Sequence, residues 1–382
     1  MTSYIASERG FLTTPDPIDH LPAYFSPWEE VGRNLPKLLT AGKLRSAVRD
    51  LPVLDAANLT SDSEYRRAMV VLSFVGHGYV WGESEMIDRV PPPLAIPWHQ
   101  LAAKLGRPAV LSYCSYALDN WRRMDRETPI ELGNLVLLQN FLGGIDEEWF
   151  VIVHVAIEAH AAPALDGLVQ AQEAAGRDEL AAVERELNRV AAALEIMNQI
   201  LLRMPERCDP YIYYHRVRPY LHGWRNHPAL PNGLVYEGVE AYGGQPQQFR
   251  GETGAQSSIV PSLDAALGIT HQKDVLYTYL QEMRDYMPPA HRAFIRSLQD
   301  GPSIRQYVVQ HRQDAPMLRD AYNNCIELME RFRSTHVGYA ENYIQKQSRR
   351  ENKNPTDVGT GGTPFMPYLR KHRNETGKHL IR

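Results

Sequence analysis

Two adjacent helical patterns at the centre of the chain, residues 147–172 and 177–203, most constrain its fold. Residues 147–172 are apolar on all sides, which is typical of a helix buried among other helices. Residues 177–203 repeat apolar side chains at helical spacing along one face, from Leu180 to Met197. We find no internal repeat and no sustained polar–apolar alternation of the kind that a large sheet requires. The sequence therefore predicts a mainly α protein.

A soft domain boundary is predicted at Gly143–Gly144, which interrupts the helical patterns. It divides a small N-terminal helical domain, residues 1–143, from a large C-terminal helical domain, residues 144–382. In the first part, helices are predicted over residues 28–49, 61–80, 97–105, 109–123 and 128–140. Thr128, Pro129 and Glu131 would form a capping box for the last of these. Later helices are predicted over residues 257–268, 274–286 and 315–347.

Composition narrows the class of protein. The formal net charge of −4 favours neither nucleic acid nor an acidic membrane as a partner. The longest apolar run, residues 149–157, is too short to span a bilayer. Three widely separated cysteines argue against a disulfide framework and fit a reducing compartment. We therefore expect a cytoplasmic protein that is a monomer or a weak homo-oligomer.

His336 is the first candidate for chemistry, because it continues an apolar stripe on the last predicted long helix. Ala321, Cys325, Leu328 and Phe332 precede it at spacings of three or four residues. One interpretation is a core histidine that is hydrogen-bonded to a carboxylate. The other is an axial ligand to haem iron, whose second ring nitrogen is usually held by an acceptor.

His154 lies in an apolar helical segment and is the second candidate. Burying an imidazole there costs free energy unless it has a partner, and Glu158 at i+4 could supply one. The alternative is a polar group that faces a cavity and is available to a ligand. No histidine in the chain follows an acidic residue by three positions, which excludes the Glu-x-x-His motifs of a di-iron bundle. His-Glu-x-x-His is also absent, which excludes that class of zinc protease.

The segment from residue 211 to 220 combines four tyrosines with two arginines. An arginine beside aromatic rings is a good carboxylate receptor, although a surface helix end with solvated charges has the same composition. His215, His222 and His227 are spaced too irregularly for a compact zinc site. Residues 359–363 (GTGGT) lack the lysine of a phosphate-binding loop and indicate a flexible loop.

Several sequence blocks occur in the order found in one known family. They are YVWG (79–82), LSYCSYALDNW (111–121), RPYLHGW (218–224), GLVYEG (233–238), AQSS (255–258), DYMPPAHR (285–292), RSTH (333–336) and GTGGT (359–363). Together they resemble the indoleamine 2,3-dioxygenase family, from about residue 66 to the C-terminus. The resemblance implies a two-domain helical haem dioxygenase fold, with haem b as cofactor and molecular oxygen as co-substrate.

The resemblance also implies roles for individual residues. His336 matches the proximal iron ligand, and Arg333 and Asp264 match residues linked to a haem propionate. His154 takes a distal position that resembles tryptophan 2,3-dioxygenase, the sister group, where a histidine bonds the indole N–H; vertebrate members of the family carry a serine there. The remaining matches concern substrate binding: Tyr113 and Phe150 line the indole pocket, Tyr213 and Arg218 receive the substrate, Thr253 and Gly254 border the pocket, and Thr360 lies on a closing loop near residues 347–363.

The implied function is cleavage of the indole C2–C3 bond of L-tryptophan, or of a related indole, to N-formylkynurenine, a step of tryptophan catabolism by the kynurenine pathway. Tyr213 stands in place of a phenylalanine, and Tyr116 stands where a smaller residue is common. Two alternatives remain open. One is a haem-dependent monooxygenase that acts on a tryptophan-derived indole, and the other is a non-catalytic haem-binding protein.

Overall fold

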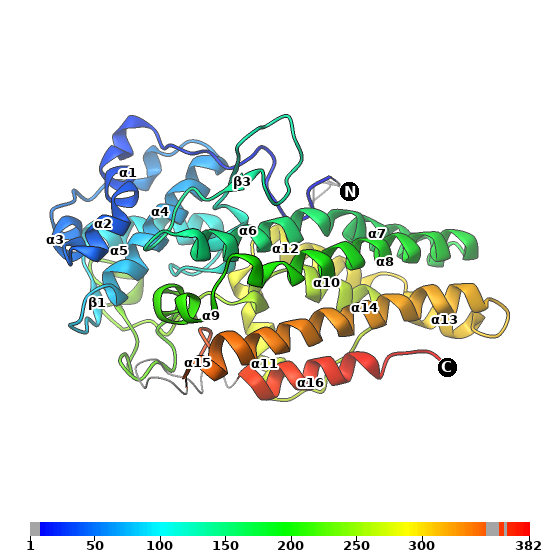
Figure 1. Cartoon of the computed structure of the whole chain (residues 1–382). Coiled ribbons are helices and arrows are strands. Elements are labelled where there is room, and N and C mark those ends of the chain that lie inside the picture. Colours follow the sequence, from blue (N-terminus) through cyan, green and yellow to red (C-terminus); the bar gives the residue numbers. More distant parts are fainter. Residues whose placement is uncertain (1–7, 349–358, 363–364) are drawn as a thin grey trace.

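The computed structural model describes residues 8–348, 359–362 and 365–382, and helices dominate it, as the sequence predicts. Shorter helices gather in the N-terminal part, and long helices run side by side through the rest of the molecule (Figure 1). The N-terminal helices are α1 (Ser26–Arg33), α2 (Leu35–Thr40), α3 (Leu44–Arg49), α4 (Asp62–Trp81) and α5 (Pro92–Leu105).

The C-terminal part carries the two longest helices, α8 and α14, together with shorter ones. They are α6 (Ile145–His160), α7 (Ala162–Gly176), α8 (Leu180–Leu202), α9 (Pro210–Ile212), α10 (Ile259–Leu267), α11 (Val275–Met283), α12 (Pro289–Asp300), α13 (Ile304–His311), α14 (Pro316–Ala340), α15 (Lys346–Ser348) and α16 (Phe365–Gly377). Helix α8 packs along both α7 and α14, and α16 packs along α14. The main hydrophobic core cluster includes residues on both sides of Gly143–Gly144, and the division into two domains stays a prediction.

Strands are short and pair in twos. β1 (Arg89–Val90) is parallel to β4 (Val235–Tyr236), with Arg89 opposite Val235. β2 (Arg122–Arg123) is antiparallel to β3 (Leu135–Val136), with Arg122 opposite Val136. Within the described residues these pairs and one isolated bridge account for the β structure, so the core is built from helices.

The apolar segment at residues 147–172 forms two helices, because the chain turns at Ala161 between α6 and α7. Pro163 follows in the first turn of α7, where its missing N–H costs no helical hydrogen bond. By length and composition, Ile145–Gly176 could cross a membrane, with a mean hydropathy of 1.3, but 72% of that apolar window is buried inside the protein. A buried core helix has the same composition, so this stretch is weak evidence for a membrane span.

Some predicted helices are wrong. Residues 128–140 form a loop and β3, because Asn134 binds loop backbone: its side-chain oxygen accepts from the Asp125 N–H at 2.9 Å, and its amide donates to the Pro129 carbonyl at 3.0 Å. Residues 109–123 form a π-helical turn, Cys114–Leu118, and the short strand β2 instead of an α-helix. Residues 28–49 form three helices instead of one. Helices α12, α13 and α16 were not predicted.

The N-terminus of α4 has a capping box. The Ser61 hydroxyl accepts from the Glu64 N–H at 3.3 Å, and the Glu64 carboxylate accepts from the Ser61 N–H at 3.3 Å. Ser61→Ala is expected to lower the free energy of unfolding by ~1 kcal/mol, measured by denaturant titration. Ser63→Ala, in the same helical turn, is the control. An equal effect of both substitutions would contradict a capping role for Ser61.

Candidate functional site

His336 lies near the C-terminal end of α14, on the stripe that the sequence predicts. Ala321, Cys325 and Leu328 of this stripe are buried where α14 packs along α8. The side chain of His336 is open to solvent, yet burial and the nearby His154 lower its pKa to about 4. A ring that is both solvated and surrounded by protein faces an internal opening, not the outer surface. At neutral pH it is therefore an uncharged imidazole with a lone pair to offer.

The imidazole of His336 is accessible to a ligand. Within the described residues neither ring nitrogen of His336 takes part in a hydrogen bond, so no acceptor orients the ring in the way expected of an axial histidine. The exposed, uncharged ring presents a nitrogen lone pair, a donor that suits haem iron.

Arg333 precedes His336 by three residues and ties α14 to α10. Its guanidinium donates to both carboxylate oxygens of Asp264, at 2.9 and 2.7 Å, and it also contacts the Thr376 hydroxyl of α16. Despite burial, which acts in the opposite direction, Arg333 and His271 hold the pKa of Asp264 below its usual value. The structure thus pairs Arg333, one turn before His336 on α14, with Asp264 of α10.

A cluster of aromatic side chains surrounds His154 of α6. The ring of Phe150 lies 4.7 Å from the rings of His154 and Tyr213, measured between centroids. Tyr113 approaches His154 edge-on at 6.0 Å, and Tyr116 lies 6.3 Å from Phe150. These residues come from α6, from the turn at residues 113–118 and from the segment after α9, so the fold gathers predicted residues that are distant in sequence.

The hydrogen bond of His154 fixes which of its nitrogens can accept. Nδ1 lies 2.7 Å from the carbonyl oxygen of Phe150, one turn earlier in α6. A carbonyl only accepts, so Nδ1 must carry the proton. Burial lowers the pKa of His154, which keeps the ring neutral. Its Nε2 is then an acceptor, and it makes no hydrogen bond with any described residue.

Glu158 does not pair with His154, so the structural interpretation of that pair is wrong. Its carboxylate accepts from the Tyr113 hydroxyl at 2.9 Å and from the Ser257 hydroxyl at 2.8 Å. Burial raises the pKa of Glu158 to about 7. The hydrogen bond to Glu158 holds the Tyr113 ring against α6. The i+4 spacing along α6 had suggested His154 as the partner of Glu158.

Arg218 is fully buried, which excludes the interpretation of this segment as a solvated surface end. It begins a 3-10 turn, Arg218–Leu221, directly after the π-helical turn Tyr213–Val217. Its guanidinium carbon lies 5.6 Å from the centroid of the Tyr214 ring, and burial lowers its pKa. Burying a cation is costly, and a carboxylate that reaches this guanidinium would offset part of that cost.

Thr253, Gly254 and Thr360 lie where two loops meet. The Thr360 hydroxyl donates to the Glu252 carbonyl at 2.6 Å, and the Thr253 hydroxyl accepts from the Ala255 N–H at 3.4 Å. A Cβ added to Gly254 would meet no atom within 4 Å, so this loop borders open space. Most of the predicted closing loop, residues 349–358 and 363–364, lies outside the described residues.

Glu252 is a buried acid that the sequence did not single out. It is 6% exposed, and its carboxylate makes no hydrogen bond or ion pair with any described residue. Burial is the main cause of the raised pKa values of Tyr113, Tyr116 and Tyr213, and the charge of Glu252 adds to it, which places Glu252 beside the aromatic cluster. The only signal in the sequence was its position next to Thr253, because a lone glutamate in a loop is otherwise ordinary.

Glu252 should make stability depend on pH. Burial raises its pKa from 4.5 to about 8, so the folded state favours the protonated acid. Its contribution to stability is fully present below pH 4.5 and is lost as pH rises through 8. Glu252→Gln is therefore expected to stabilise the protein by a few kcal/mol more at pH 8.5 than at pH 5, by order of magnitude, measured by thermal unfolding. The exposed Glu327→Gln is the control, and parallel pH profiles for parent and Glu252→Gln would contradict the assignment.

Comparison with known proteins adds an independent finding. A family model described as Indoleamine 2,3-dioxygenase matches residues 1–379. Indoleamine 2,3-dioxygenase 1 of Rattus norvegicus is 37% identical over 99% of this chain and 95% of the relative. Indoleamine 2,3-dioxygenase 2 of Homo sapiens is 35% identical over 99% of this chain and 94% of the relative. A protein of Fusarium equiseti named 6-hydroxytryptophan 2,3-dioxygenase fscD is 32% identical over 99% of this chain and 96% of its own length.

Proposed function

This chain belongs to the indoleamine 2,3-dioxygenase family of haem-iron dioxygenases that use molecular oxygen, and we propose that it cleaves the indole C2–C3 bond of L-tryptophan to N-formylkynurenine. The observation that carries this choice of substrate is the buried Arg218 next to an aromatic cluster that contains His154. An amino acid with an indole side chain offers a carboxylate to Arg218 and an aromatic N–H to His154.

His336 would hold the haem iron, and the Arg333–Asp264 pair would fix the helix that carries it. Haem, when bound, supplies the iron that activates dioxygen. The exposure of His336 and its uncharged ring support this assignment. A neutral imidazole is the form that binds a metal ion.

The other side chains would bind and orient the substrate. Arg218 would receive the carboxylate through two parallel hydrogen bonds, while Phe150 and Tyr113 form walls for the indole ring. Nε2 of His154 would accept the indole N–H. Tyr213, Thr253, Gly254 and Thr360 would border the same region, and the loop that contains Thr360 would exclude water when it closes.

Product analysis tests the proposed reaction. Purified haem-loaded protein with a reductant, tryptophan and ¹⁸O₂ is expected to give N-formylkynurenine that carries both labelled oxygen atoms. A product with one labelled oxygen and an intact ring would instead identify a monooxygenase. Haem binding with no turnover of tryptophan or of 6-hydroxytryptophan would identify a non-catalytic haem protein. The second substrate is included because the relative from Fusarium equiseti is named for it.

We further propose that the protein works in the cytoplasm. All three cysteines are free and buried, which suits a reducing compartment. Burial raises the pKa of Cys325 to about 12, so its thiol stays protonated and unreactive.

His154→Ser tests the proposed contact with the indole N–H. Losing one hydrogen bond costs about 0.5–1.5 kcal/mol, and leaving a buried partner unpaired costs about 1–3 kcal/mol. The parent is expected to turn over 1-methyltryptophan weakly or not at all, because that substrate has no N–H to donate. His154→Ser is expected to retain haem and to narrow the gap in kcat/KM between tryptophan and 1-methyltryptophan. His160→Ser, on the same helix, is the control. An unchanged substrate ratio in His154→Ser would show that His154 does not contact the indole nitrogen.

A further inference from the structure

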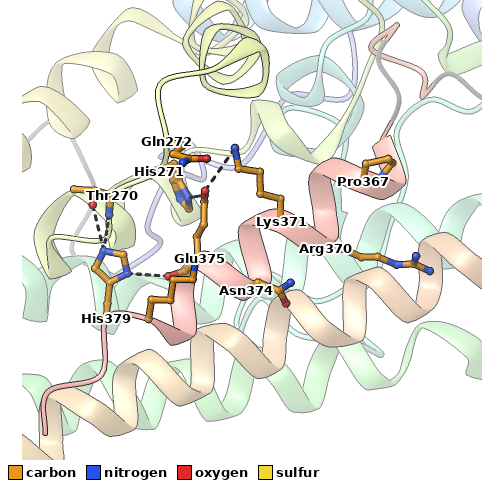
Figure 2. A pocket seen from close by; sticks show the side chains of 10 residues that line it. Thr270, His271, Gln272, Pro367, Arg370, Lys371, Asn374, Glu375 and His379 are labelled. Atoms are coloured by element: carbon orange, nitrogen blue, oxygen red, sulfur yellow. Dashed lines mark hydrogen bonds and ion pairs between the residues drawn. The ribbon is translucent and has the colours of Figure 1, made fainter.

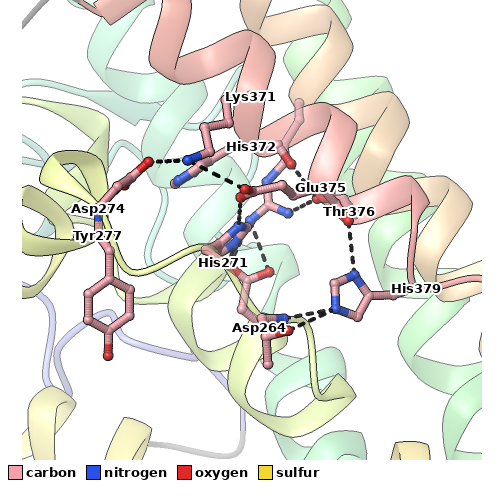
Figure 3. A network of polar contacts seen from close by, with 11 residues as sticks. Asp264, His271, Asp274, Tyr277, Lys371, His372, Glu375, Thr376 and His379 are labelled. Carbon is pink, nitrogen blue, oxygen red and sulfur yellow. Dashed lines mark hydrogen bonds and ion pairs between the residues drawn. The ribbon is translucent and has the colours of Figure 1, made fainter.

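A second cluster of ligand-type side chains lies on the C-terminal helix, away from the aromatic cluster around His154. His372 and Glu375 are three residues apart on α16 and share one face of that helix. His271 comes from the loop between α10 and α11 and meets them there, as Figure 3 shows. Each of the three offers one ligand atom, and these atoms lie within 4.8 Å of one another.

The two imidazoles are held close together. Their rings stack with centroids 4.2 Å apart and an interplanar angle of 16°. Nε2 of His372 is buried and has no hydrogen-bond partner among the described residues. A buried polar atom without a partner costs free energy, and such an atom in a native structure calls for an explanation such as an ion. Burial, together with nearby His271 and Arg333, lowers the pKa of His372 to about 4, so this ring is neutral and can donate a lone pair.

His271 is oriented by a carboxylate in the manner of a metal-binding histidine. Its Nε2 lies 3.2 Å from Asp264, while its Nδ1 lies 2.7 Å from Glu375. A histidine that ligates a metal ion through one nitrogen usually donates the other N–H to a carboxylate. Without an ion, Nδ1 carries a proton that Glu375 accepts. Once that proton is lost, Nδ1 becomes the ligand atom beside Glu375 and His372.

The cluster is reachable from solvent. A surface pocket of about 750 Å³ is lined by His271, Glu375 and neighbouring residues, with Arg370, Lys371 and Lys378 along the same lining (Figure 2). An ion could enter there, and water could fill the positions that protein atoms leave open. Lys371 lies 3.6 Å from Glu375 and also pairs with Asp274, so Asp274 offsets part of its charge.

We propose that His271, His372 and Glu375 bind one divalent transition-metal ion of the zinc class, with water completing the coordination. Two imidazoles and one carboxylate suit Zn²⁺, whereas Ca²⁺ and Mg²⁺ prefer oxygen ligands throughout. Binding replaces the contact between Nδ1 of His271 and Glu375 by two bonds to the ion and releases a proton from that nitrogen. The three ligands do not include His336, and the site does not depend on the proposed substrate.

Metal titration of the haem-loaded protein tests the site, since bound haem occupies His336. After treatment with a chelator and dialysis, calorimetric titration with ZnCl₂ is expected to show one ion per chain. His372→Ala and Glu375→Gln are each expected to weaken that binding at least ~10-fold. His379→Ala, which changes a histidine of the same pocket outside the cluster, is expected to leave it unchanged. Circular dichroism and haem absorbance check that each variant folds.

Anomalous X-ray diffraction from a crystal of the parent soaked in ZnCl₂ locates the ion independently of any variant. A peak between His271, His372 and Glu375 supports the proposal. It is overturned if the parent binds no zinc, if His372→Ala and Glu375→Gln bind as tightly as the parent, or if the anomalous peak lies elsewhere.

Discussion

His336→Ala is expected to yield a folded protein that retains little haem, with affinity reduced by more than ~10-fold. The parent ring is neutral and exposed and makes no hydrogen bond within the described residues, so removing it deletes the candidate iron donor with little other change. Haem content per chain, measured by absorbance of the pyridine complex, gives the result.

Two further variants separate ligation from structure. His336→Gly with added imidazole is expected to regain haem, because a free imidazole can occupy the emptied position. His311→Ala, which removes a histidine of α13 that contacts Asp178, is expected to keep full haem content. Full haem occupancy in His336→Ala, with an unchanged ferrous spectrum, would show that another group ligates the iron.

Arg218→Ala is expected to lower kcat/KM for tryptophan by a factor of about 30 to several thousand, because truncating one member of a buried charge pair costs ~2–5 kcal/mol. Haem content should not change, since Arg218 acts on the substrate and not on the cofactor. Arg218→Lys is expected to recover only part of the loss, because an ammonium group lacks the planar fork that binds a carboxylate at two points. Steady-state kinetics with each variant provide the measurement.

Tryptamine shows whether the carboxylate is the group that Arg218 binds. This indole lacks a carboxylate, so its poor turnover should be comparatively insensitive to Arg218→Ala. Arg216→Ala is the matched control, because Arg216 lies two residues away and is exposed. Equal losses for tryptophan and tryptamine in Arg218→Ala would argue for a structural role for Arg218 instead of a carboxylate receptor.

The sequence predicted the parts of this site that depend on local pattern. The stripe that ends in His336 is a periodic signal. The break at Gly143–Gly144 is a conformational signal, and both glycines adopt positive φ values, of 71° and 103°. Glu158 shows the limit of such reasoning. Its partners Tyr113 and Ser257 are distant in sequence, so local spacing favoured His154 instead.

The wrong helix at residues 128–140 has a similar cause. Thr128, Pro129 and Glu131 match a helix start, but Asn134 offers its amide to loop backbone, and β3 pairs with β2. Long-range contacts here outweigh local propensity. Helix α16 was not predicted, because it is strongly polar and few of its side chains are buried. Because His372 and Glu375 lie on α16, apolar periodicity also could not predict the polar cluster that they form with His271.

The contacts of α16 have a consequence for how the protein is made. Thr376 touches Arg333, and Glu375 binds His271, so the last helix joins α14 to the loop after α10. Synthesis runs from the N-terminus, and domains fold as units as they emerge. While α16 is still inside the ribosome, His336 has been made but the helix that carries it lacks this support. Acquisition of the cofactor is therefore expected to follow the emergence of α16 from the ribosome.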